Sequence, residues 1–102
     1  MDWGCDETSK ISREFDGDAC DFCERYKNEG LSRSSKLLLK FILDGNAQDK
    51  IILDLGCGAG GLSMELLRHG AQSAVGFDLS PRMIIAATDS ALATGFEGRA
   101  KF

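Results

Sequence analysis

A glycine-rich loop at residues 56–61 constrains the fold of this chain more than any other feature. It follows a short apolar run, Ile51-Ile52-Leu53-Asp54-Leu55, and precedes a segment with leucines at helical spacing. Such an apolar run between polar residues and glycines is typical of a strand buried on both faces of a parallel sheet. Glycines between a strand and a helix permit a sharp turn and let a ligand reach the main chain and the N–H groups at the helix N-terminus. The sequence therefore predicts a strand, a ligand-binding loop and a helix.

The residues after this helix repeat the alternation. Residues 74–77 predict a second strand, and Ser80 as N-cap with Pro81 in the first turn predicts another helix, which Gly95 ends. Residues 101–102 predict the start of a third strand. This order predicts an α/β fold, a Rossmann-like, doubly wound parallel sheet, of which the chain holds only the N-terminal part: strands 1 and 2 and the start of strand 3.

The residues before the first strand give weaker signals. Residues 1–30 carry scattered acidic and aromatic side chains without a sustained period, which predicts irregular structure with a short helix near 18–27. Residues 32–44 have apolar side chains at helical spacing, and Ser34 or Ser35 is the expected cap. We therefore expect a second helix, which lies against an apolar surface.

Two segments follow from these patterns. Residues 1–30 form an N-terminal segment, and residues 31–102 form the N-terminal half of a larger, truncated domain. A sheet of two strands and the start of a third leaves the first strand without a neighbour on one side. We therefore expect the chain to be part of a longer protein.

Composition excludes several classes of protein. The chain of 102 residues is 43% hydrophobic and 27% charged, as in ordinary globular proteins. Its formal net charge of −4, without a long basic run, predicts no binding to nucleic acid. The apolar stretches are too short to span a membrane, and no signal peptide is recognisable. Because neither a membrane span nor a signal peptide is recognisable, we expect a cytoplasmic protein. The four irregularly spaced cysteines indicate no disulfide framework, and we expect them to be reduced.

The glycine spacing alone leaves two classes of ligand open. Gly56, Gly58 and Gly61 satisfy the dinucleotide-binding pattern, and Asp78 lies near the distance at which an acid would bind a ribose. Asp54 favours the other class, because its carboxylate would repel a pyrophosphate and attract the ammonium group of an amino acid.

Two stretches resemble a known family. Residues 52–60, Ile-Leu-Asp-Leu-Gly-Cys-Gly-Ala-Gly, resemble motif I of the class I S-adenosylmethionine-dependent methyltransferases, and residues 75–83 resemble the segment that follows it. The similarity covers about residues 50–90. Residues 26–43 are also similar, more weakly, to the helix that caps the cofactor in many of these enzymes. The resemblance implies S-adenosylmethionine as cofactor and transfer of its methyl group to an acceptor.

The resemblance also implies roles for single residues. Asp54 would anchor the methionine ammonium group, Asp78 would accept hydrogen bonds from the ribose hydroxyls, and Leu79 and Met83 would border the adenine. Met83 is equally well read as a core methionine. The methionine portion would lie against residues that follow Asp54: Leu55, Gly56, Cys57, Gly58 and Gly60.

The acceptor and any catalytic base stay unidentified, because in this family they depend on residues after later strands. Two alternatives remain: a nicotinamide dinucleotide-dependent oxidoreductase and a non-catalytic cofactor-binding fragment. No metal site is expected, because Cys20 and Cys23, even with Cys5, lack a fourth ligand. His69 at a helix end is expected to cap that helix rather than act as a base.

Overall fold

The fold is a three-stranded parallel sheet with helices between its strands, and a computed structural model describes it for residues 24–102. Residues 24–29 are helical, at the end of the helix expected near residues 18–27, the rest of which lies outside the described residues. The further elements are α2 (Arg33–Asp44), β1 (Ile51–Leu55), α3 (Gly61–Arg68), β2 (Ser73–Phe77), α4 (Pro81–Thr94) and β3 (Ala100–Lys101). The strand order β1-β2-β3 confirms the predicted α/β, Rossmann-like arrangement.

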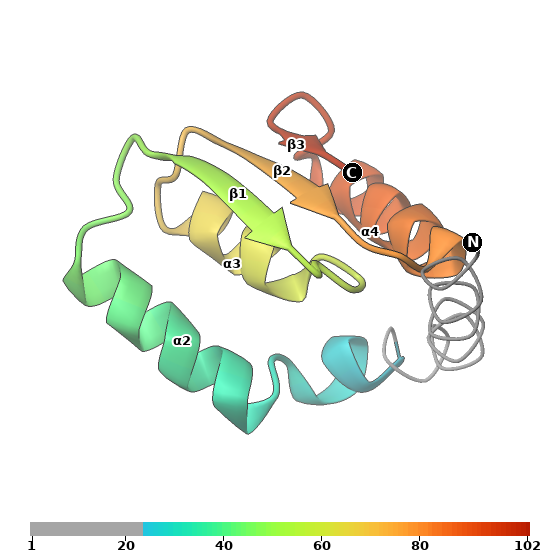
Figure 1. The fold of residues 1–102 in the computed structure, drawn as a ribbon, viewed down its shortest axis with the longest axis horizontal. Helices are drawn as coiled ribbons and strands as arrows, with labels where there is room; N and C mark the ends of the chain where they lie inside the picture. Colours follow the sequence, from blue (N-terminus) through green and yellow to red (C-terminus); the bar gives the residue numbers. More distant parts are fainter. Residues whose placement is uncertain (1–23) are drawn as a thin grey trace, which may run out of the picture.

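One face of the sheet carries the core. In the register of the sheet Ile52 pairs with Ala74, and Ala74 pairs with Ala100, so these three side chains share a face. Leucines 66 and 67 of α3 pack onto this face, and apolar side chains of α2 complete the cluster. Figure 1 shows α2, α3 and α4 on this same side of the sheet.

The opposite face is bare among the described residues. Ile51, Leu53 and Leu55 of β1 are 68%, 63% and 73% exposed, and Phe77 of β2 is 57% exposed. The expectation that the first strand is buried on both faces is therefore wrong for residues 24–102. The physical reason is that every helix of this region lies on the core side, so nothing covers the alternate side chains of the strand.

The helix ends follow local rules, with one correction. Ser80 caps α4 by accepting a hydrogen bond from the N–H of Met83, Pro81 lies in the first turn, and Gly95 ends the helix in a left-handed conformation, as predicted. The cap of α2 is Ser32 rather than Ser34 or Ser35. The Ser32 hydroxyl accepts a hydrogen bond from the Ser35 N–H at 3.3 Å, and it is Ser32 that has the extended backbone of an N-cap.

Gly76 of β2 lies where the sheet meets other side chains closely. A Cβ atom built there would be 2.6 Å from the ring of Phe102 and 2.9 Å from Cβ of Cys57. Both distances are shorter than a van der Waals contact, so only glycine fits this position without movement of its neighbours.

Candidate functional site

A cavity of about 360 Å³ lies at the C-terminal end of β1, where the glycine-rich loop begins. One wall is the loop itself. The other comes from the chain around the start of α2. The residues that line it are Arg25, Tyr26, Gly30, Leu31, Ser32, Ser35 and Leu38 on one side, and Asp54 to Ala59 with Gly61 and Leu62 on the other.

The glycines of the loop adopt backbone angles that side chains disfavour. Gly56, Gly58 and Gly60 have φ of 73°, 56° and 84°. A Cβ atom at Gly56 or Gly58 would meet nothing within 4 Å, so the space beside the main chain is open to a ligand. The loop is held to the sheet because the N–H groups of Gly56 and Cys57 both donate to the carbonyl oxygen of Phe77, at 2.8 and 2.9 Å.

Asp54 brings a carboxylate to this cavity. It is the fourth residue of β1, it is partly buried, and it lines the cavity. The hydroxyl of Ser63, in the first turn of α3, donates to Oδ2 of Asp54 at 2.7 Å. Ser63 was not singled out from the sequence, because nothing in its local pattern indicates a contact nine residues away.

Asp78 brings a second carboxylate to the same loop. It follows β2 directly, and its two oxygens accept hydrogen bonds from main-chain N–H groups, Oδ2 from Gly58 and Oδ1 from Ser80, both at 2.9 Å. The structure therefore joins Asp54, the glycine-rich loop and Asp78 at one edge of the sheet, where the carboxyl ends of β1 and β2 meet.

The two residues expected beside the adenine differ in accessibility. Leu79 is 54% exposed, whereas Met83 is 2% exposed and is one of the buried residues of α4. Neither residue lines the cavity of the loop. The contact of Leu79 and Met83 with adenine therefore stays a prediction.

Cys57 is a buried, protonated thiol. Burial, together with the nearby carboxylates of Asp54 and Asp78, raises the pKa of Cys57 to about 12 from its ordinary value of 9.0. A nucleophilic cysteine needs its thiolate form near neutral pH. Cys57 therefore fits a small packing residue of the loop, not a catalytic thiol.

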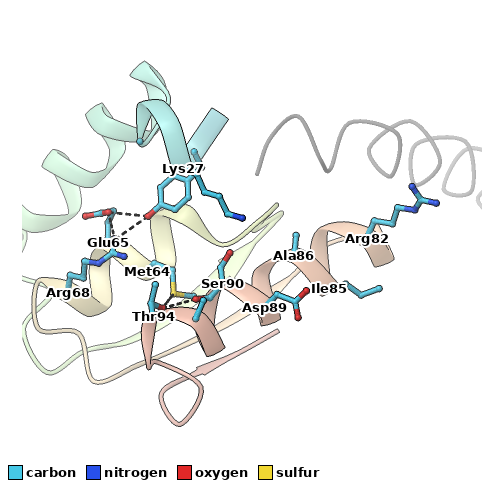
Figure 2. Close-up of a pocket in the computed structure, with 13 residues that line it drawn as sticks. Lys27, Met64, Glu65, Arg68, Arg82, Ile85, Ala86, Asp89, Ser90 and Thr94 are labelled. Carbon is cyan, nitrogen blue, oxygen red and sulfur yellow. Dashed lines mark hydrogen bonds and ion pairs between the residues drawn. The ribbon is translucent and has the colours of Figure 1, made fainter. Parts of the chain in front are cut away.

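Tyr26 lines the cavity, although the sequence analysis assigned no role to this residue. Its hydroxyl donates to Oε1 of Glu65 at 3.1 Å and accepts from Arg68 at 3.2 Å, while Arg68 and Glu65 form an ion pair at 2.5 Å (Figure 2). Burial raises the pKa of Tyr26 above its ordinary value. No signal in the sequence indicates this contact. In the structure, a Cβ atom at Gly61 would be 3.1 Å from the ring of Tyr26, so the glycine leaves room for that ring.

A second, wider cavity of about 740 Å³ lies beside the first, and Tyr26 lines both. Figure 2 shows Glu65 and Arg68 of α3 on one of its walls and Arg82, Ile85 and Asp89 of α4 on another. The two helices meet at its floor, where the Thr94 hydroxyl lies 3.7 Å from the sulfur of Met64. Among residues 24–102, no three metal-binding side chains gather here or elsewhere.

The remaining sequence expectations concern a histidine and three cysteines. Nδ1 of exposed His69 lies 2.7 Å from the carbonyl oxygen of Glu65, at the end of α3, in the position of a helix cap. Cys5, Cys20 and Cys23 lie outside the described residues.

The family whose description is "methyltransferase domain" matches residues 52–102, which are half of the chain and include all of β1 but its first residue, the loop and Asp78. The chain belongs to the class I S-adenosylmethionine-dependent methyltransferases. The cofactor of this family is S-adenosylmethionine, which decides between the two ligand classes that the glycine spacing left open.

Curated relatives of this methyltransferase domain include ribosomal protein L11 methyltransferases. The protein of Pasteurella multocida (strain Pm70) is 37% identical over 70 residues, which are 69% of this chain and 24% of the relative. The protein of Lachnospira eligens is 45% identical over 56 residues, 55% of this chain and 16% of the relative. The chain thus spans a quarter or less of the length of these relatives.

Solved methyltransferase structures share the fold. The magnesium protoporphyrin IX methyltransferase of Synechocystis PCC 6803 with bound S-adenosylmethionine has a TM-score of 0.72 over 100% of this chain and 55% of its own, at 21% identity. A putative RNA methyltransferase of Pyrococcus horikoshii has a TM-score of 0.60 over 67% of this chain and 33% of its own, at 25% identity. The first of these supports the fold alone, because its sequence identity is low.

Proposed function

We propose that the intact protein transfers the methyl group of S-adenosylmethionine to an acceptor, and that residues 54–83 bind this donor. The observation that carries the proposal is the placement of two carboxylates, Asp54 and Asp78, on either side of one open glycine-rich loop. They lie 24 residues apart in the chain but at adjacent strand ends, because β1 and β2 are parallel neighbours.

The chemistry of these groups fits the donor. Its methionine portion ends in an ammonium group, which the Asp54 carboxylate attracts, and its ribose carries two hydroxyls, which donate to a carboxylate such as Asp78. The main chain at Gly56 and Gly58 leaves open space for the methionine portion. A Cβ atom at Gly60 would instead lie 3.1 Å from the ring of Phe102 and 3.2 Å from Cβ of Ala87. Leu55 and Cys57 would belong to the same surface, and Leu79 and Met83 would border the adenine.

The part of this chain in the reaction is to hold the donor in place. When bound, S-adenosylmethionine supplies a methyl carbon that its sulfonium already activates for displacement. The Asp54 carboxylate fixes one end of the donor and the Asp78 carboxylate the ribose, so the reactive centre between them is oriented. The chain around Tyr26 forms the wall opposite the loop, and there it would exclude water from the methionine portion of the bound donor.

Recognition of the acceptor is assigned to residues other than these. In the family this task falls to the chain after later strands, and residues 24–102 hold the first three strands only. We therefore assign no catalytic base to Cys57 or His69, and we propose that any base lies with the acceptor site.

The test is a comparison of two aspartate variants of the intact protein by calorimetry. Asp54→Ala should weaken S-adenosylmethionine by roughly 10- to 150-fold, the loss of one charge-assisted contact of about 1.5–3 kcal/mol. Asp44→Ala removes the same charge from an exposed site at the end of α2 and should leave the affinity unchanged. Tight binding of a nicotinamide dinucleotide, with no binding of S-adenosylmethionine, would refute the proposal.

We further propose a cytoplasmic location. The reduced state expected of the cysteines supports it, as does the absence of a disulfide framework in the sequence. Within residues 24–102, no helix has the length and apolar character needed to cross a membrane. Fractionation of cells that produce the tagged full-length protein would test this location.

A further inference from the structure

Ser63 has a buried hydroxyl that forms its hydrogen bond outside its own helix. It is the third residue of α3, and its exposed fraction is 0%. Serines in helices commonly return their hydroxyl to a carbonyl of the preceding turn. The Ser63 hydroxyl instead donates to Oδ2 of Asp54, at 2.7 Å, across the interface between α3 and β1.

This hydrogen bond fixes one oxygen of the carboxylate. Within residues 24–102, Ser63 is the only residue recorded as a donor to the Asp54 side chain. Asp54 also lines the cavity of the loop. Because Oδ2 is held against α3, the carboxylate keeps one rotamer, and Oδ1 is left to accept from a ligand.

We propose that Ser63 is a positioning residue for the donor: its hydroxyl orients the Asp54 carboxylate toward the ammonium group of S-adenosylmethionine. This inference rests on the proposed role of Asp54. An alanine at position 63 would leave the charge of Asp54 in place but would free its rotamer. The carboxylate would then lose more conformational entropy on binding the ammonium group, and the affinity would fall.

The test compares two ligands that differ in the ammonium group alone. One is S-adenosylhomocysteine, and the other is S-adenosyl-4-thiobutyrate, in which hydrogen replaces the ammonium group. Calorimetry of each variant of the intact protein gives the ratio of the two dissociation constants, that of S-adenosyl-4-thiobutyrate divided by that of S-adenosylhomocysteine. A lower ratio means that the protein distinguishes the ammonium group less well. Because both ligands are measured on the same preparation, an inactive fraction of the protein does not change this ratio.

Ser63→Ala should weaken S-adenosylhomocysteine by about tenfold, which corresponds to about 1.4 kcal/mol, and leave S-adenosyl-4-thiobutyrate within about twofold of wild type. Ser63→Thr keeps a hydroxyl and should restore the wild-type ratio. A ratio that Ser63→Ala leaves unchanged, or that both variants change equally, would overturn the positioning role.

The Asp54→Ala variant separates this inference from the proposal on which it rests. If Asp54 binds the ammonium group, Asp54→Ala lowers the ratio, and Ser63→Ala added to it lowers the ratio no further. If Asp54→Ala weakens both ligands equally, the role of Asp54 itself is wrong. If Asp54→Ala lowers the ratio and Ser63→Ala does not, Asp54 binds the ammonium group without help from Ser63.

Discussion

The carboxylate of Asp78 accepts a hydrogen bond from the main-chain N–H of Gly58 at 2.9 Å, although 20 residues separate them. The bond connects the loop after β1 to the end of β2. Asp78 thus has two tasks in the proposed site: it shapes the glycine-rich loop before any ligand binds, and it offers acceptors to the ribose. A substitution at this position removes both.

Asp78→Ala should therefore weaken S-adenosylmethionine by about 100-fold or more, because two ribose contacts are lost together with the support of the loop. The same variant should speed hydrogen exchange at the Gly58 amide without ligand, since that N–H loses its acceptor. Mass spectrometry after exchange measures the second effect. Asp89→Ala, an exposed carboxylate on α4, is the control. Protection of the Gly58 amide equal to wild type would contradict the role in the loop.

Gly58→Val should abolish binding of S-adenosylmethionine. A β-branched side chain resists the φ of 56°, and its methyl groups would occupy the open space beside the loop. Gly98→Val is a matched control, because Gly98 has no positive φ and a Cβ there would meet nothing within 4 Å. Calorimetry and circular dichroism of the two variants check the prediction. An unchanged affinity of a folded Gly58→Val protein would show that the donor binds elsewhere.

Cys57 should resist alkylation in the folded protein. With its pKa raised to about 12, the thiol stays protonated at pH 8, whereas an unfolded cysteine is partly ionised there. Iodoacetamide should therefore react about 100-fold more slowly, or slower still, than after denaturation, in a variant whose other three cysteines are serine. The same shift keeps the contribution of this thiol to the free energy of unfolding at its full value below about pH 9, and that contribution falls as the pH rises toward 12. Equal rates for folded and denatured protein would contradict the burial of this thiol.

Residues 1–102 produced alone should associate or fold poorly. The exposed face of β1 and β2 offers Ile51, Leu53, Leu55 and Phe77 to any apolar surface, and β1 has one unpaired edge in the described region. Light scattering and binding of a hydrophobic dye should report this association, and Leu53→Lys should reduce it. A sharp two-state melt of a monomeric 102-residue chain would show that the face needs no cover.

The sequence was sufficient where structure depends on neighbours along the chain. Ser80 with Pro81, and Gly95, specify the ends of α4 through a cap, a fixed φ and a left-handed turn. The loop at residues 56–61 could be located because a strand, alternate glycines and a helix follow one another. The approach of Asp78 to this loop follows from parallel strands, which place their carboxyl ends at one edge.

The rest depends on contacts between distant residues. The bare face of β1 could not be predicted, because an apolar strand has the same sequence whether one face or both faces are covered. Tyr26 and Ser63 were missed for a related reason: their partners, Glu65 and Asp54, lie 39 and 9 residues away. The preference for Ser32 over Ser34 or Ser35 depends on where the chain turns from extended to helical.

The close approach of Phe102 and Cys57 to Gly76 affects how the tolerance of each position to substitution can be interpreted. In a saturation library, position 76 should tolerate substitution as poorly as position 58, although the close contacts at Gly76 are with the protein's own side chains. Selection for abundance would deplete variants at 76, whereas selection for donor binding among abundant variants would deplete those at 58. Intolerance to substitution alone would therefore assign too many residues to the binding site. Two selections are needed to distinguish residues that support the sheet from residues that bind the donor.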